Sequence, residues 1–213
     1  MKKKQIIPLV ILVVVILALI FIFTRNKGDN KKRLLQIYDQ LESSQEYLFE
    51  MKQDENNKTI MAKKGEKTII DQYSKDSHTT TIIKENDTYL VLHDREEYYI
   101  YRHNNIEQSV LTDGLKEIIN KKFTAGTEKI KGQKYNYEEY QGSTMFMQSS
   151  SLDVEENDIR TRFYFDSNEN LVYIRTIKGV TQELLNIKID KEVDDSIFEI
   201  PANYAENVLN WYN

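Results

Sequence analysis

Three histidines are the side chains of this 213-residue chain that are best suited to metal binding or proton transfer. His78, His93 and His103 fall on three different strand-like stretches or at their ends. None of them has a partner at the short spacing of a metal-binding motif such as H-x-x-x-H, and the chain contains no cysteine. We therefore expect three exposed strand histidines and no metal site.

The segment DSNEN, Asp166 to Asn170, begins like a calcium-binding loop because oxygen-bearing side chains stand at alternate positions. Such a loop should continue with a glycine and close with a glutamate, but Leu171 and Ile177 occupy those two positions. Strand-like runs, RFYF and LVYI, flank the segment on its two sides. These features predict a hairpin turn rather than a calcium site.

Pairs of adjacent glutamates are the remaining candidates for acid–base chemistry: Glu96–Glu97, Glu138–Glu139 and Glu155–Glu156. Neighbouring residues on a strand point to opposite faces, so the two members of a pair cannot act together as acid and base. We expect all three pairs on a solvated surface. The sequence also lacks G-x-S-x-G, a phosphate-binding glycine loop and a Cys–His pair. The chain is therefore predicted not to be an enzyme and to need no cofactor.

The charge balance argues against nucleic-acid binding. Lysines and arginines number 29 against 34 aspartates and glutamates, which gives a net charge of −5. Proteins that bind a phosphate backbone usually present an excess of basic residues. The 14 tyrosines are accordingly expected in strands, where tyrosine is favoured, rather than stacked on bases.

A run of apolar residues near the N-terminus, Ile6 to Phe23, predicts a transmembrane helix. As a helix, these residues would span about 27 Å, close to the hydrocarbon thickness of a bilayer. The alternative is a cleaved signal peptide, which would have a shorter apolar region and a small-x-small cleavage site. Because the run ends in IFIFTRNKG, we expect an uncleaved signal-anchor.

Basic residues on the two sides of this segment indicate its orientation. The lysines of residues 2–4 favour a cytoplasmic N-terminus, although the basic residues of 25–33 weaken the asymmetry. We expect a cytoplasmic lysine cluster and membrane anchor over 1–25, a linker over 26–33 and an extracytoplasmic domain over 34–213. The absence of cysteine suits a bacterial envelope protein, and equally a cytosolic one. The predicted location is the bacterial cell membrane, with a single pass.

Beyond the anchor, the period of the apolar residues changes along the chain. A helix over residues 31–42 is predicted by apolar residues at helical spacing: Leu34, Ile37, Tyr38 and Leu41. Six strand-like runs follow, with links too short for parallel crossovers. A second helical stretch, SVLTDGLKEIINKKF, precedes a second series of strand-like runs. We expect an α+β domain in which two or three helices cover one face of an antiparallel sheet.

The last fifty residues carry a more specific pattern, which reads RFYFDSNENLVYIRTIKGVTQELLNIKIDKEVDDSIFEIPANY. It resembles the LolA-like superfamily of bacterial envelope proteins, which includes the outer-membrane lipoprotein carrier. The resemblance covers residues 31–204 in the order of elements, and is residue-specific only over 163–204. It implies a curved half-barrel sheet wrapped around the helices, and the strand-like runs of the sequence number about 11. It also implies a concave cavity that holds acyl chains or other apolar cargo.

Four residues of VDDSIFEIPANY are expected to form a structural clip after the last strand: Phe198, Ile200, Pro201 and Tyr204. Phe198 and Ile200 should turn into the core. Pro201 has no N–H to offer a neighbouring strand, so pairing should stop there, where the edge would be exposed. Tyr204 and Trp211 are expected to lie back on the sheet.

The resemblance also implies a ligand cavity, whose candidate lining residues are Met145, Met147, Phe163, Phe165, Leu185 and Ile187. We expect a membrane-anchored binding protein for lipid, lipoprotein acyl chains or another apolar ligand. The lipoprotein carrier is soluble, so the anchor argues against shuttling between membranes. The alternative is a protein-interaction or signalling ectodomain without a ligand. An open cavity of several hundred cubic ångströms would favour the first function, and a core filled by inward Phe and Tyr the second.

Overall fold

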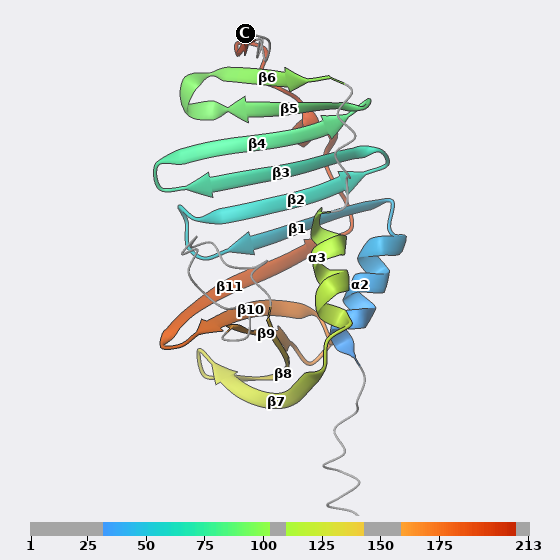
Figure 1. The fold of residues 1–213 in the computed structure, drawn as a ribbon, viewed down its shortest axis with the longest axis vertical. Helices are drawn as coiled ribbons and strands as arrows, with labels where there is room; N and C mark the ends of the chain where they lie inside the picture. The colour runs from blue at the N-terminus through green and yellow to red at the C-terminus, as the bar shows by residue number, and fades with distance from the viewer. Residues whose placement is uncertain (1–31, 103–109, 143–158, 208–213) are drawn as a thin grey trace, which may run out of the picture. The chain divides into compact units, whose positions relative to one another are not determined.

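A computed structural model of the protein describes residues 32–102, 110–142 and 159–207 (Figure 1). In these ranges the chain forms an α+β domain with two helices, α2 (Arg33–Ser43) and α3 (Val110–Ile119), and one 12-stranded sheet. The strands are β1 (Glu46–Lys52), β2 (Lys58–Lys64), β3 (Lys67–Ser74), β4 (Ser77–Lys84), β5 (Asp87–Leu92), β6 (Glu97–Tyr101), β7 (Phe123–Ile130), β8 (Gln133–Gln141), β9 (Ile159–Phe165), β10 (Leu171–Lys178), β11 (Thr181–Asp190) and β12 (Ala205–Asn207). Both predicted helices are confirmed, and the sheet has 12 strands rather than about 11.

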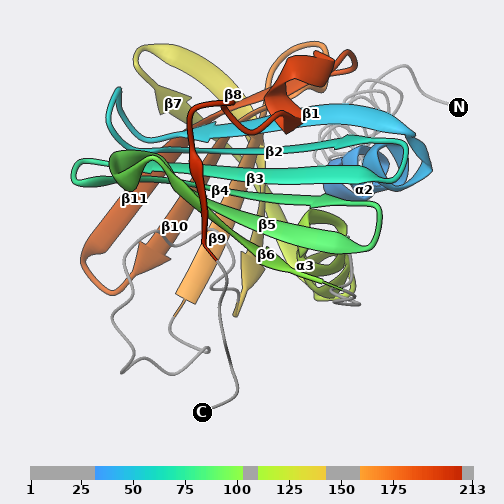
Figure 2. The same cartoon turned by 90° about the horizontal axis from the view of Figure 1, so that it is seen from above.

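The sheet joins two antiparallel meanders, β1 to β6 and β7 to β11. They meet where β11 pairs with β1, with Phe49 opposite Ile189. The full order is β12-β6-β5-β4-β3-β2-β1-β11-β10-β9-β8-β7, so the sheet is open, with β12 and β7 at its edges. Figure 2 shows β9 and β10 running at a steep angle to β1 through β5, as expected of a strongly twisted sheet.

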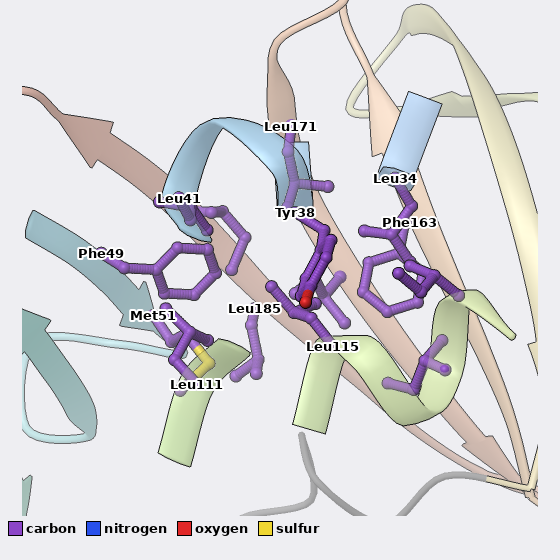
Figure 3. Packing of buried hydrophobic residues seen from close by; sticks show 14 of the residues in the cluster. Leu34, Tyr38, Leu41, Phe49, Met51, Leu111, Leu115, Phe163, Leu171 and Leu185 are labelled. Atoms are coloured by element: carbon purple, nitrogen blue, oxygen red, sulfur yellow. The ribbon is translucent and has the colours of Figure 1, made fainter. Parts of the chain in front are cut away.

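Both helices pack on one face of the sheet, over its middle strands (Figures 1 and 2). Three residues of α2 at helical spacing are buried: Leu34, Tyr38 and Leu41. They contact apolar residues of α3, including Leu115, and inward residues of the sheet, including Phe49 and Phe163 (Figure 3). The apolar stripe of each helix therefore finds its partner on the buried face of the sheet.

Glu138 of β8 is completely buried and holds the start of α2. Its Oε1 accepts a hydrogen bond from the backbone N–H of Arg33 at 2.6 Å, and its Oε2 accepts one from that of Leu34 at 3.2 Å. The hydroxyl of Tyr140 donates to Oε2 as well, at 2.9 Å. A carboxylate is favoured here because the first N–H groups of a helix lack intrahelical partners. The prediction of a solvated Glu138 is wrong, although its neighbour Glu139 does lie on the opposite face.

The C-terminal segment, residues 193–204, lies on the sheet face opposite the helices. It includes the short helix η4 (Asp195–Phe198), and Phe198 is completely buried there. Phe198 belongs to a second core cluster, which joins the C-terminal segment to strands β1 through β6. Its members are Leu48, Ala62, Ile69, Ile82, Tyr89, Val91, Tyr98, Val193, Ile197, Phe198, Ile200 and Tyr204. The segment thus covers apolar residues that would otherwise face solvent.

Strand pairing ends at Asp190, well before Pro201, and resumes at Ala205, so the prediction that it stops at Pro201 is wrong. Strand β11 lies between β1 and β10, so its end is not at an edge of the sheet. The chain crosses the sheet face, and β12 then pairs with β6 in parallel, with Ala205 opposite Glu97. A parallel pair is possible because the crossing supplies the long connection that a tight turn cannot. Trp211 lies outside the described residues.

Within the described ranges, no helix has the length and apolar character needed to cross a membrane. The predicted anchor over residues 6–23 lies outside those ranges and stays a prediction.

Candidate functional site

The predicted cavity residues fall into two groups. Met145 and Met147 lie outside the described residues. The other four belong to the core cluster between the helices and the sheet, with exposed fractions of 0%, 0%, 1% and 9% for Phe163, Phe165, Leu185 and Ile187. Contact between these four residues and a ligand stays a prediction, and it would require the helices to make room.

Aromatic rings fill the space beneath the helices. Tyr140 packs edge-to-face on Phe163, with ring centroids 5.7 Å apart, and Phe123 stacks on Tyr140 at 5.4 Å. Tyr38 and Phe49 are buried in the same cluster (Figure 3). Edge-to-face rings at this spacing are the preferred packing of aromatic side chains in a close-packed core. This part of the helix-side face is therefore filled core.

A cavity of about 410 Å³ opens beside the C-terminal end of α2. Seven of its ten lining residues have polar or charged side chains; the ten are Gln40, Leu41, Ser43, Ser44, Gln45, Glu46, Tyr47, Ile189, Asp190 and Lys191. Binding sites for apolar molecules are lined mostly by hydrophobic and aromatic side chains. None of the four described candidate residues lines this cavity, so it is not the ligand cavity expected from the sequence.

The helix-side face continues beyond the helices as a row of side chains across β2 to β6, which we call the apolar row. Pairing places its members opposite one another in turn: Met61, Ile70, Thr81, Leu90 and Tyr99. Met61 lies opposite Phe49 and packs on the core cluster, which fixes the face. All five members are half-buried. At ~4.8 Å between strands, the row is about 19 Å long.

Two buried threonines lie beside the apolar row on the same face. Thr68 and Thr88 each precede a row member by two residues, and they flank Ile83 across the sheet. Their exposed fractions are 7% and 3%, and neither hydroxyl has a hydrogen-bond partner among the described residues. Ile83, which lies between them, is buried as well.

On the opposite face of the sheet, three residues with metal-binding atoms come together: Asp71 on β3, His78 on β4 and His93 at the end of β5. His93 begins the short helix η2 (His93–Arg95). The Nε2 atom of His78 lies 2.8 Å from Oδ1 of Asp71, and the exposed fractions of the two side chains are 25% and 14%. The prediction of exposed histidines without partners is therefore wrong for His78 and His93. His103 lies outside the described residues.

A chain of hydrogen bonds connects this cluster to Tyr204. The Thr80 hydroxyl donates to Asp71 Oδ1 at 2.5 Å, so its oxygen accepts from Nε2–H of a neutral His93 at 2.7 Å. Nδ1 of His93 is then the acceptor for the Tyr204 hydroxyl at 3.0 Å. Burial, followed by the nearby His78, lowers the pKa of His93, which favours this neutral form. The arrangement is not a nucleophilic triad, because Asp71 contacts the hydroxyl rather than the base.

Hairpin symmetry is the sequence signal that could have found this cluster. Glu85 and Asn86 both have positive φ, 56° and 67°, as a two-residue hairpin turn of type I′ requires. Thr79 pairs with Leu92 across this turn, so His78 and His93 come to the same end of the hairpin. The two histidines are equally far from the turn on its two sides. A search for metal ligands a few residues apart in the sequence does not find such a pair.

Comparisons with known proteins give limited likeness. No protein-family profile and no curated protein matches the chain. A solved structure of an uncharacterised conserved protein from Thermus thermophilus is 7% identical, with a TM-score of 0.46, over 84% of this chain and 98% of that one. The lipoprotein LppX of Mycobacterium tuberculosis is 12% identical, with a TM-score of 0.42, over 78% of this chain and 99% of that one. Because both TM-scores are below 0.5, neither likeness supports an argument about function.

Proposed function

We propose that the protein is a membrane-anchored, extracytoplasmic binding protein that holds an apolar ligand, such as a lipid or lipoprotein acyl chain, along the apolar row. It is not an enzyme in this proposal. The observation that carries the proposal is that the apolar row continues the buried face of the sheet beyond the two helices. Its side chains are only half-buried, although they lie in register with the core residue Phe49.

An acyl chain suits the dimensions and chemistry of the apolar row. The row is about 19 Å long, comparable with the ~15 Å of hydrocarbon in one bilayer leaflet. It is one side chain wide, and its members are apolar or, in Thr81 and Tyr99, amphipathic. Each ~40 Å² of apolar surface that a ligand covers stabilises the complex by about 1 kcal/mol. A ligand would cover β3 to β6 much as the helices cover the middle strands.

The predicted anchor gives the domain a source of such ligands. Residues 6–23 would hold the domain beside a bilayer, since α2 begins only ten residues after the end of that segment. The LolA-like pattern of residues 163–204 supports the same function, because proteins of that superfamily bind acyl chains. An anchored protein would present or receive lipid at one membrane.

The filled core beneath the helices favours a second function, a protein-interaction or signalling ectodomain without a ligand. Tyr38, Phe49, Tyr140 and Phe163 leave the helices closely packed on the sheet. In that case a partner protein would cover the apolar row instead of a lipid. The two functions differ in what co-purifies with the chain.

Native mass spectrometry of the full chain, released from detergent micelles, tests the proposal. We expect adducts with lipid masses on the wild type, and their loss in the double variant Ile70→Asp, Leu90→Asp. The control is Val180→Asp, because Val180 is fully exposed at the hairpin between β10 and β11 and should leave the adducts unchanged. A wild-type protein that keeps its fold but carries no lipid would contradict the proposal and leave the interaction ectodomain.

A further inference from the structure

We propose that Asp71, His78 and His93 form a binding site for one divalent transition-metal ion of the Zn²⁺ type. The site lies on the sheet face opposite the apolar row and does not depend on the function proposed for that row. One ligand atom from each of the three residues lies within 4.8 Å of the other two. Ligand atoms around Zn²⁺ lie at about 2.0–2.2 Å from the ion, so two ligand atoms of a tetrahedral site are ~3.4 Å apart and the present separations must shrink. The proposal requires side-chain rotations that bring the three atoms this close.

The donor set selects the class of metal. Two imidazole nitrogens and one carboxylate oxygen suit zinc and its neighbours in the first transition row, whereas calcium and magnesium prefer oxygen ligands only. Three protein ligands leave a fourth tetrahedral position for water or an exogenous ligand. The site therefore belongs to the open type of zinc site rather than to closed structural sites with four protein ligands.

The local charge also suits a cation. Asp71 belongs to the site, and the carboxylate of Asp94 lies next to it, accepting a hydrogen bond from the backbone N–H of His78 at 3.1 Å. One positive group near the site is Lys58, whose Nζ lies 4.1 Å from the ring centroid of Tyr73, on which His78 stacks. Asp71 and Asp94 thus place two carboxylates in or beside the site.

Metal binding must change the ring stack. The rings of His78 and His93 are parallel within 7°, with centroids 3.7 Å apart. The lone pair of an imidazole nitrogen lies in the plane of its ring, so two parallel rings cannot direct both lone pairs to one ion. One ring must tilt. His93 has the freer side, since Tyr73 stacks on His78 at 3.9 Å whereas Tyr204 meets His93 edge-on at 5.5 Å.

Residues around the ligands supply the supporting hydrogen bonds that metal sites usually need. The Tyr204 hydroxyl lies 3.0 Å from Nδ1 of His93, the nitrogen that would not bind the metal. On metal binding Nδ1 becomes the protonated nitrogen and donates to the Tyr204 oxygen, which fixes the orientation of the ring. Thr80 already holds Asp71 Oδ1. Through Tyr204, the ion would strengthen the attachment of the C-terminal segment to the sheet.

The test is zinc binding by the full chain in detergent, made without a polyhistidine tag and stripped with a chelator. Titration against a fluorescent zinc chelator should give one Zn²⁺ per chain for the wild type. We expect His93→Ala and Asp71→Ala to weaken binding at least ~100-fold, and Tyr204→Phe to weaken it about 10-fold. His103→Ala is the matched control and should bind as the wild type does. No stoichiometric zinc on the wild type, or equal binding by His93→Ala, would overturn the proposal.

A second measurement keeps the test decisive if a variant fails to fold. X-ray absorption at the zinc edge of the wild-type protein should show scattering from two imidazoles and a short oxygen shell. A spectrum with one imidazole or none would overturn the proposal without any substitution.

Discussion

The hydroxyl of Tyr204 lies 3.0 Å from Nδ1 of His93, although 111 residues separate the two along the chain. His93 directly follows β5, and Tyr204 ends the C-terminal segment that crosses the same sheet face. The bond therefore joins the C-terminal segment to the first meander. Beyond it, β12 pairs with β6 and covers that edge of the sheet. This contact gives the C-terminal segment a role in holding the sheet together.

Replacing Tyr204 by Phe should loosen the C-terminal segment without unfolding the domain. The substitution keeps the edge-on ring contact with His93 but removes the hydroxyl, so we expect a loss of about 1 kcal/mol. Hydrogen exchange at the amides of Ala205 and Asn207 should accelerate. Tyr98→Phe is the control, because its hydroxyl bonds the exposed Glu206 at 3.1 Å and should contribute less. Equal exchange rates in wild type and Tyr204→Phe would contradict this role.

Glu138→Gln should destabilise the protein strongly, because the amide nitrogen of Gln would face the backbone N–H groups of α2. We expect a decrease of about 2 kcal/mol in the free energy of unfolding, measured with urea. For comparison, Glu117 has a 70% exposed side chain and lies 3.6 Å from Lys121. Glu117→Gln should cost less than ~0.5 kcal/mol. A similar small effect for Glu138→Gln would show that α2 does not need this carboxylate.

Thr68→Val and Thr88→Val should leave stability unchanged or raise it by up to ~1 kcal/mol. Each substitution removes a buried hydroxyl that has no partner among the described residues, and valine has nearly the same shape. We expect the opposite effect on stability for Thr80→Val, because the Thr80 hydroxyl bridges Asp71 and His93. It should destabilise the metal-free protein by about 1–3 kcal/mol. Thermal unfolding with a chelator present distinguishes the two cases.

Glu128 should make stability depend on pH in the acidic range. Burial alone would raise its pKa, but hydrogen bonds from Tyr164, Arg175 and Arg162 outweigh burial and hold the pKa of Glu128 below its ordinary value of 4.5. A lowered folded-state pKa means stability that is present above pH 4.5 and lost as the pH falls through the folded-state value. Glu128→Gln should therefore flatten the stability curve below pH 4.5. An unchanged slope in urea unfolding between pH 5 and pH 3 would contradict this.

The local patterns of the sequence predicted most of the elements. Runs of alternating apolar and polar residues joined by short turns predicted the two meanders, and apolar residues at helical spacing predicted α2 and α3. The turn at Asp166 is confirmed, since its Oδ1 accepts hydrogen bonds from the backbone N–H groups of Asn168 and Asn170. These features depend on neighbours within a few residues, which is why the sequence alone was sufficient.

Features that depend on distant pairing were not predicted. Glu138 is buried because α2, more than 100 residues earlier, begins above it. The cluster of Asp71, His78 and His93 depends on the register of two hairpins, and β12 on a crossing of the sheet face. The candidate ligand residues Phe163 and Leu185 lie beneath the helices. The sequence could not predict this, because core residues and residues of an apolar binding face show the same alternating pattern. Only the positions of the helices show which apolar residues of the sheet are core and which are left for a binding face.

The most direct test of the apolar row compares two adjacent tyrosines of β6. Tyr99 belongs to the row, whereas Tyr98 faces the C-terminal segment on the other side of the sheet. Each would be replaced by the photo-crosslinker benzoylphenylalanine in the full chain, irradiated in cell membranes and analysed by mass spectrometry. The proposed function predicts a lipid adduct at position 99 and none at position 98. No lipid at position 99, or equal adducts at both positions, would contradict it.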